Sequence, residues 1–353
     1  YSGGVSCPAL LLEPQSTNTI SSSNTVNAMN YVSNITKIDN ATISPDSTFN
    51  AMIFTPTETQ GVHRSGYSTT AGLYTQGDTV TFSGFIKANG YDFVTMGGFF
   101  GGEKAVFNVS NGTIVSQESN VINTKIVELA NDWYRLSTTY TFQNSIGNGY
   151  LYAGIYVMNT ENGYAFTGDG VSGVYGYGFQ AEQKPFATSY IPTNGASVTR
   201  NADTLNLLNV SNVIGQSEGT LFFDANFNTA DSFNISLSDS TSSNYISIDT
   251  TSVKSIFARV QSGGSTQATI NTAGSYFQDG DRLKCAIAYK ANDFAFYING
   301  TQIGTNTSGS VPTTDDIRFA RFNGSLAAHQ SVNEFKLYNT RLTNTELATL
   351  TTL

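Results

Sequence analysis

Short stretches in which apolar and polar residues alternate recur along most of the chain, and clusters of Gly, Asn, Asp and Ser separate them at intervals of roughly ten residues. Alternation with a period of two is the pattern of a β-strand with one buried face. Clear examples lie at residues 79–87, 132–142, 149–158, 219–227, 282–289 and 293–304. The pattern predicts an all-β chain made of antiparallel strands, with the short, evenly spaced strands of jelly-roll sandwiches.

Two local signals fix elements near the end of the chain. Asn299-Gly300 stands between two apolar runs, and this dipeptide accepts the positive φ that both centres of a type I′ hairpin turn require. Thr343-Asn-Thr-Glu is a capping box, in which the first and fourth side chains satisfy each other's backbone N–H groups. It predicts a short helix through Leu350, and no other part of the sequence carries a convincing helix signal.

The alternation also assigns side chains to faces. In 132–142 it puts Trp133 in phase with Arg135, and it puts Tyr134, Leu136, Thr138, Tyr140 and Phe142 on the opposite face. Because Trp133 lies inside a regular strand, we expect it to be a core residue. In 174–182, Tyr175, Tyr177, Phe179 and Ala181 stand at every second position, which predicts a closing strand with these four side chains on one buried face.

The alternation stops after Glu182, where Pro185, Pro192 and the turn residues 193–197 follow. A length of 353 residues exceeds the roughly 100–200 that are usual for one domain. We therefore predict two tandem antiparallel β-sandwiches and one short C-terminal helix. The expected boundaries are a lead-in strand segment at 1–19, a jelly roll at 20–192, a linker at 193–202 and a second sandwich at 203–353.

Composition limits the classes of partner. Only 12% of the residues are charged and the net charge is −9, whereas nucleic-acid binding needs a basic surface that displaces counterions from phosphates. We therefore exclude nucleic acid as a partner. No apolar run approaches the roughly 20 residues that span a bilayer, so we expect no membrane insertion. The chain begins at Tyr1 rather than Met, as a piece of a longer polypeptide would.

The residues offer little for catalysis, and we predict that the chain is not an enzyme. Glycosidases need two carboxylates that face one cleft. Only Asp279 and Asp281 stand two residues apart, and they flank Gly280 in a predicted turn. His63 and His329 are far apart and have no neighbouring Cys, which leaves zinc unsupported. The two cysteines, Cys7 and Cys285, are too few for a disulfide framework, and Cys285 is expected to be a buried thiol.

Binding is the remaining chemistry. Aromatic rings stack on the C–H faces of sugars, and amide and carboxylate groups hydrogen-bond sugar hydroxyls. The candidates lie in or beside Gly/Asn/Asp turns, and ordinary core packing is the alternative for each of them: Tyr91, Asp92, Phe99, Phe100, Tyr164 and Phe166. Calcium takes oxygen ligands from similar loops, and Asp169 and the pair Asp315-Asp316 fit it loosely. We predict no cofactor other than a calcium ion at such a loop.

Four stretches resemble one family. They are CPALLLEPQ (residues 7–15), DWYRLS (132–137), GFQAEQKPFATSYIPTNGASVTRNAD (178–203) and LKCAIAYKANDFAFYINGTQ (283–302). Their order is similar to that in bacteriophage tail-fibre and head-fibre surface proteins, where a carbohydrate-binding-module-like jelly roll precedes a concanavalin A-like or laminin-G-like sandwich. The resemblance implies an extracellular protein on the virion surface that binds host glycans. The net charge of −9 favours neutral or weakly charged glycans among them.

The same resemblance implies contacts with other virion subunits. Shallow aromatic sites bind weakly and need several copies for stable attachment, which predicts a homo-oligomer, with a trimer as the first hypothesis for a fibre-like particle. Two alternatives remain open. The chain could be the accessory glycan-binding region of a secreted polysaccharide-degrading enzyme, or a purely structural virion subunit. An enzyme domain in the adjoining sequence would favour the first alternative, and a capsid-docking segment or coiled coil would favour a virion.

Overall fold

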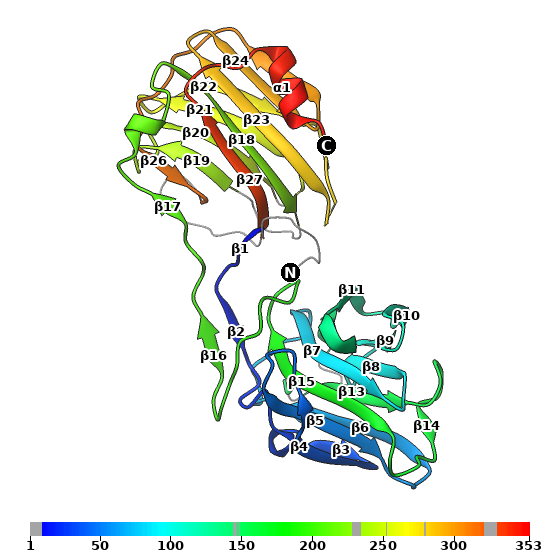
Figure 1. Ribbon diagram of the computed structural model, residues 1–353. Helices are drawn as coiled ribbons and strands as arrows, with labels where there is room; N and C mark the ends of the chain where they lie inside the picture. Colours follow the sequence, from blue (N-terminus) through cyan, green and yellow to red (C-terminus); the bar gives the residue numbers. More distant parts are fainter. Residues whose placement is uncertain are drawn as a thin grey trace. The chain divides into compact units, whose positions relative to one another are not determined.

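Antiparallel strands make up nearly all of the regular structure in the computed structural model of the chain (Figure 1). The structure describes residues 9–143, 147, 149–227, 234–251, 253–278, 280–320 and 330–353. Contacts divide the chain into two compact units. The first sandwich is Ser16–Arg200, and the second sandwich combines Tyr1–Gln15 with Asn201–Leu353. The all-β prediction is confirmed.

The first sandwich has two large antiparallel sheets and one two-stranded ribbon. In the β13 sheet the order is β10 (Thr113–Gln117), β9 (Lys104–Asn108), β8 (Phe93–Gly98), β13 (Tyr152–Met158), β6 (Gly61–Ser68) and β14 (Ala165–Phe166), and β3 (Tyr31–Ser33) also pairs with β6. In the β7 sheet the order is β11 (Val121–Glu128), β12 (Tyr134–Thr141), β7 (Thr79–Asn89), β15 (Gly173–Glu182), β5 (Phe49–Pro56) and β4 (Ile35–Ile43). The ribbon pairs β2 (Ser16–Asn18) with β16 (Val198–Arg200).

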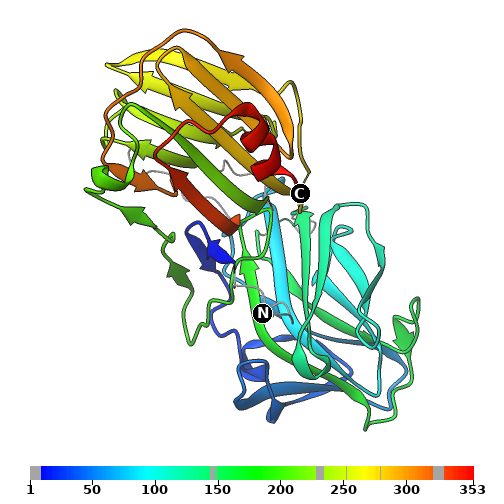
Figure 2. The same ribbon diagram turned by 45° about the horizontal axis from the view of Figure 1, so that its top comes forward.

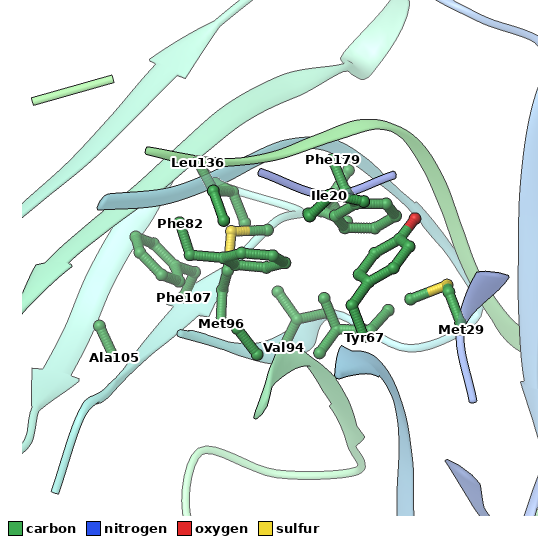
Figure 3. Close-up of a cluster of buried hydrophobic side chains, with 14 of the residues drawn as sticks. Ile20, Met29, Tyr67, Phe82, Val94, Met96, Ala105, Phe107, Leu136 and Phe179 are labelled. Carbon is green, nitrogen blue, oxygen red and sulfur yellow. The ribbon is translucent and has the colours of Figure 1, made fainter. Parts of the chain in front are cut away.

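The core of the first sandwich lies between its two sheets, as Figure 3 shows. Phe82, Leu136 and Phe179 project from the β7 sheet, and Met96 and Phe107 project from the β13 sheet. All five are 0% exposed. The rings of Phe82 and Phe179 stack with their centroids 5.9 Å apart. Apolar side chains at every second position therefore hold the two layers together, as the alternation in 79–87 and 132–142 predicts.

The prediction that Tyr175, Tyr177, Phe179 and Ala181 share one face is wrong. A β-bulge between Tyr177 and Gln180 shifts the register of β15 against β7, and Gly178 within it has a φ of 59°. The extra residue turns the strand over. Phe179 and Ala181 therefore enter the core, whereas Tyr175 and Tyr177 join a cluster on the outer face of the β7 sheet, where Trp133 is 2% exposed. The expected burial of Trp133 is confirmed, although outside the core between the sheets.

The second sandwich likewise has two antiparallel sheets, each of six strands. In the β23 sheet the order is β1 (Leu10–Leu12), β27 (Gln330–Tyr338), β18 (Glu218–Phe227), β23 (Arg282–Lys290), β24 (Asp293–Ile298) and β25 (Thr301–Asn306). In the β20 sheet the order is β17 (Asn206–Leu207), β26 (Asp316–Arg318), β19 (Asn234–Ser238), β20 (Tyr245–Thr250), β21 (Ile256–Ser262) and β22 (Ser265–Asn271). Cys285 is a buried free thiol between them, as predicted, and burial raises its pKa.

The segment expected to be a separate lead-in strand is shared between the two sandwiches. Its strand β1 pairs with β27 in the second sandwich, and its strand β2 pairs with β16, which falls in the segment expected to be a linker. Between them, Glu13 and Asp203 exchange hydrogen bonds: the N–H of Asp203 donates to the carbonyl of Glu13, and the N–H of Glu13 donates to a carboxylate oxygen of Asp203. The first sandwich is thus inserted in sequence between β1 and the rest of the second. Cys7 lies outside the described residues.

The two local signals near the end of the chain are confirmed. Asn299 and Gly300, with φ of 48° and 80°, are the turn between β24 and β25. Thr343 and Glu346 form the capping box of α1 (Asn344–Thr351). Figure 2 shows this helix against the outer face of the β23 sheet, where Leu347 packs in a cluster with Phe222 and Tyr297. The other helical segments are 3₁₀ turns at Val26–Ala28, Ala130–Asp132 and Ser211–Val213.

Candidate functional site

Aromatic side chains gather on the outer face of the β13 sheet, the face that points away from the core of the first sandwich. Strand alternation in β6 and β13 sends His63, Ser65, Ile155 and Val157 inward and leaves Arg64, Tyr152 and Tyr156 on the outer face. These side chains form a cluster separate from the core. We call it the aromatic face, and its members are Tyr31, Arg64, Phe99, Phe100, Tyr152, Tyr156 and Tyr164.

Phe99 forms the floor of the aromatic face. Gly66 and Gly154 are paired neighbours on β6 and β13, and a Cβ at either position would lie within 3 Å of the Phe99 ring. Only glycine leaves room for a ring to lie this close to the backbone. Phe99 is consequently 4% exposed, and its ring centroid lies 5.3 Å from that of Tyr31 and 5.1 Å from that of Tyr156.

Arg64 lies at the centre of the aromatic face. Its guanidinium carbon is 4.3 Å from the ring centroid of Tyr31, and its Nη1 and Nη2 donate to the hydroxyls of Tyr156 at 3.3 Å and Tyr31 at 3.1 Å. In the described part of the chain Arg64 makes no ion pair, and its buried Nε has no hydrogen-bond partner. Guanidinium presents five N–H donors, so this side chain retains donors for a ligand.

The other rings border Arg64 and are only partly buried. Tyr31, Phe100, Tyr152 and Tyr164 are all half-buried, and they meet one another and Tyr156 mostly edge to face, as in the pair Tyr156–Tyr164 at 5.7 Å. At one edge, Lys104 Nζ lies 5.9 Å from the Tyr156 ring and pairs with Glu118 at 3.1 Å. The face thus combines apolar ring surface with phenol, guanidinium and carboxylate groups, which is the mixture that contacts sugars.

The structure brings together only some of the residues that the sequence nominated. Phe99, Phe100 and Tyr164 belong to the aromatic face. Tyr91 and Phe166 pack against each other at 5.3 Å, and Phe166 lies 4.4 Å from the ring of the buried His63. Asp92 is exposed and lies outside the cluster. The alternative of structural packing fits Phe166 best, because its side chain is 6% exposed.

Sequence reasoning missed Tyr31, Arg64, Tyr152 and Tyr156. A weak signal was available, because Tyr150, Tyr152 and Tyr156 share one phase of a strand in which Leu151, Ala153, Ile155 and Val157 hold the other. Both phases are rich in apolar atoms, so the pattern does not say which one faces the core. Tyr31 and Arg64 come from separate strands that only the pairing of β3 with β6 brings together.

Glu103 is a buried residue at the end of the loop between β8 and β9, which also carries Phe99 and Phe100. Its side chain accepts a hydrogen bond from the N–H of Gln143 at 2.6 Å, and the residue is 2% exposed. Burial raises the pKa of this carboxyl to about 7, with a smaller upward effect from Glu118 and opposing effects from the Gln143 N–H and Lys104. Glu103 therefore holds a proton well above the pH at which an exposed glutamate loses it.

The acids suggested for calcium have other roles in the structure. Asp169 is exposed, and its Oδ1 accepts hydrogen bonds from the N–H groups of Val171 and Ser172 within its own turn. Asp316 is buried and pairs with Arg318 at 2.7 Å. Within the described ranges no three His, Cys, Asp or Glu side chains cluster as metal ligands would. Calcium binding stays a prediction.

The residues considered for catalysis are only partly described. Asp281 accepts a hydrogen bond from the N–H of Gln278 at 2.8 Å, in keeping with a turn. Its partner Asp279 and the second histidine, His329, lie outside the described residues.

Among the helices of the described part, none has both the length and the apolar character needed to cross a membrane.

No protein-family model and no curated protein matches the sequence. Among solved structures, the chain is similar to the carbohydrate-binding module CBM40 of a Ruminococcus gnavus sialidase (12% identity, 42% of this chain and 96% of that chain, TM-score 0.35). It is also similar to a pentraxin from Limulus polyphemus (13% identity, 41% of this chain and 71% of that chain, TM-score 0.31). A third similar structure is galectin LEC-6 of Caenorhabditis elegans (16% identity, 38% of this chain and 89% of that chain, TM-score 0.28). Likenesses at this level leave the function to be argued from the residues of this chain.

Proposed function

We propose that the chain is a non-catalytic glycan-binding protein and that the aromatic face of the first sandwich is its binding surface. The observation that carries the proposal is Arg64, which is held among tyrosines on an outer sheet face and makes no ion pair in the described part of the chain. A cation with spare donors, bordered by half-buried rings, has the chemistry of a sugar subsite.

In the expected binding mode, aromatic rings contact the apolar face of the sugar, and polar groups hydrogen-bond its hydroxyls. The exposed edges and faces of Tyr31, Tyr152 and Tyr164 would contact the C–H surface of a sugar ring. The guanidinium of Arg64 and the phenol hydroxyls around it would hydrogen-bond sugar hydroxyls. Phe99, which is 4% exposed, would hold Arg64 and Tyr31 in place from below rather than touch the ligand.

The biological setting of this binding is a separate part of the proposal. The resemblance of four sequence stretches to bacteriophage fibre proteins supports a place on a virion surface and a role in attachment to host glycans. Shallow sites bind weakly, so stable attachment requires several linked copies of the binding surface. This supports a homo-oligomer, with a trimer as the first hypothesis. Light scattering on the purified chain tests the oligomer, and a monomer at high protein concentration would contradict it.

A glycan array with the intact chain tests the binding, followed by calorimetric titration of the best neutral ligand. Arg64→Gln and Tyr164→Ala should each weaken that binding about tenfold or more, because each removes a direct contact. Tyr276→Ala is the matched control, since this tyrosine is 37% exposed in the second sandwich. Its affinity should equal that of the parent chain.

Three outcomes would contradict the proposal. If Arg64→Gln and Tyr164→Ala bind as well as the parent chain, the aromatic face is not the site. If the oligomer binds no glycan at all, a purely structural role replaces glycan binding. If the intact chain releases reducing sugar from its ligand, the protein is an enzyme rather than a binding module.

A further inference from the structure

The outer face of the β20 sheet in the second sandwich carries a hollow of about 500 Å³. The strands β19, β20, β21 and β22 are neighbours in this sheet (Figure 1), and their inward positions, such as Ile246, Ile248 and Val260, are packed in the core. The outward positions are mainly polar. The hollow is lined by Asn234, Ser242, Tyr245, Asp249, Thr250, Phe257, Arg259, Gln261 and Gly264.

Strand register places the lining residues in neighbouring rows on this face. Tyr245 is opposite Gln261 in one row, and Asp249 is opposite Phe257 in another. Arg259 lies between these rows on β21, opposite Ser247. The volume of the hollow falls within the ~300–1,000 Å³ of small-molecule sites.

Arg259 gives the hollow a positive group that forms no ion pair with any carboxylate of the described residues. Its guanidinium carbon lies 4.8 Å from the ring centroid of Phe257, and the side chain is half-buried. In the ranges that the structure describes, Arg259 makes neither an ion pair nor a side-chain hydrogen bond. Other arginines of this sandwich are neutralised: Arg282 pairs with Asp224 at 2.5 Å, and Arg318 pairs with Asp316 at 2.7 Å. The planar guanidinium is shaped to bind a carboxylate through two parallel hydrogen bonds.

We propose that this hollow is a second ligand site, which binds an oligosaccharide bearing a carboxylated sugar, such as a uronic or sialic acid. Arg259 binds the carboxylate. Polar side chains of the lining, Gln261 among them, hydrogen-bond the hydroxyls, which both donate and accept hydrogen bonds. The site lies in the other sandwich, so it does not depend on the function proposed for the aromatic face.

The test is calorimetric titration of the intact chain with a panel of oligosaccharides that carry uronic or sialic acid, each paired with its methyl ester. The esters keep every hydroxyl and lose the charge. We expect at least one acid to bind about tenfold or more tightly than its ester, because hydrogen bonds to charged groups are the stronger ones. Arg259→Gln should reduce the affinity for the acid to that for the ester.

Two further variants separate this site from the aromatic face. Arg64→Gln should leave binding of the acid unchanged. Gln261→Ala should weaken binding of acid and ester alike, and it removes a half-buried side chain, so it serves if Arg259→Gln fails to fold. The proposal is overturned if no acid is preferred over its ester, if Arg259→Gln keeps the preference, or if Gln261→Ala leaves the affinity for the acid unchanged.

Discussion

Replacing Glu103 by Gln should make the first sandwich more stable at neutral and basic pH and leave its stability unchanged in acid. The buried carboxyl has its pKa raised from 4.5 to about 7. A raised pKa means that the folded state binds the proton more tightly than the unfolded chain, so the free energy of unfolding falls as pH rises between those two values. Glutamine is neutral at every pH and has nearly the same shape.

The size of the effect follows from the two pKa values. One pKa unit corresponds to about 1.36 kcal/mol, so a rise from 4.5 to about 7 corresponds to about 3 kcal/mol. Below pH 4.5 the parent chain and Glu103→Gln should have the same free energy of unfolding. Above pH ~7 the variant should be more stable by about 3 kcal/mol, because the parent must keep a buried, ionised carboxylate.

Denaturant unfolding monitored by tryptophan fluorescence measures this difference. The chain has one Trp, and Trp133 is 2% exposed in the first sandwich, so its emission reports that sandwich alone. Other groups titrate in the same range, and subtracting the parent from the variant at each pH removes their contribution. A difference that stays constant from pH 4 to 8 would refute a raised pKa at Glu103. Lys104 and Glu118 are unchanged in both proteins, which keeps the comparison matched.

Three further predictions concern stability. Gly300→Ala should lower the free energy of unfolding of the second sandwich by about 1 kcal/mol, because Gly300 has a φ of 80° and a Cβ would lie 3.3 Å from Thr352 Oγ1. An unchanged melting temperature would contradict the type I′ turn. Phe99→Ala should lower the free energy of unfolding of the first sandwich, measured by Trp133 fluorescence, by about 3 kcal/mol. Phe100→Ala should lower it clearly less, since Phe99 is 4% exposed and Phe100 is half-buried; equal losses would argue against the packing of Phe99 on Gly66 and Gly154. A fragment of residues 16–200 should unfold in one cooperative transition, whereas an unfolded fragment would show that the first sandwich needs the rest of the chain.

Features coded by neighbouring residues were predictable from the sequence. The Asn299-Gly300 turn and the Thr343 capping box each depend on two to four consecutive residues, and the strand at 132–142 keeps its alternation without interruption. In each case local chemistry and the tertiary structure favour the same conformation. The two-sandwich, all-β architecture follows from many such strands.

Features coded by strand pairing were not predictable. The bulge in β15 turns Tyr177 outward and Phe179 inward, and its position depends on the register with β7 rather than on the β15 sequence alone. The aromatic face depends on β3, β6 and β13 lying side by side. Arg259 likewise looks like an ordinary outward charge until the strand pairing places it opposite the buried Ser247 and among the residues that line the hollow.

The insertion of the first sandwich between β1 and the rest of the second sets an order of assembly on the ribosome. Residues 16–200 are contiguous, so they can fold while the chain is still being synthesised. Strand β1 leaves the ribosome before the first sandwich, yet its partner β27 follows that sandwich in the chain, so the second sandwich closes only after the residues up to Tyr338 have been made. The reciprocal hydrogen bonds between Glu13 and Asp203 lie where the chain leaves and re-enters the second sandwich. At such a junction one inserted domain can replace another during evolution while every strand pairing of the host is kept.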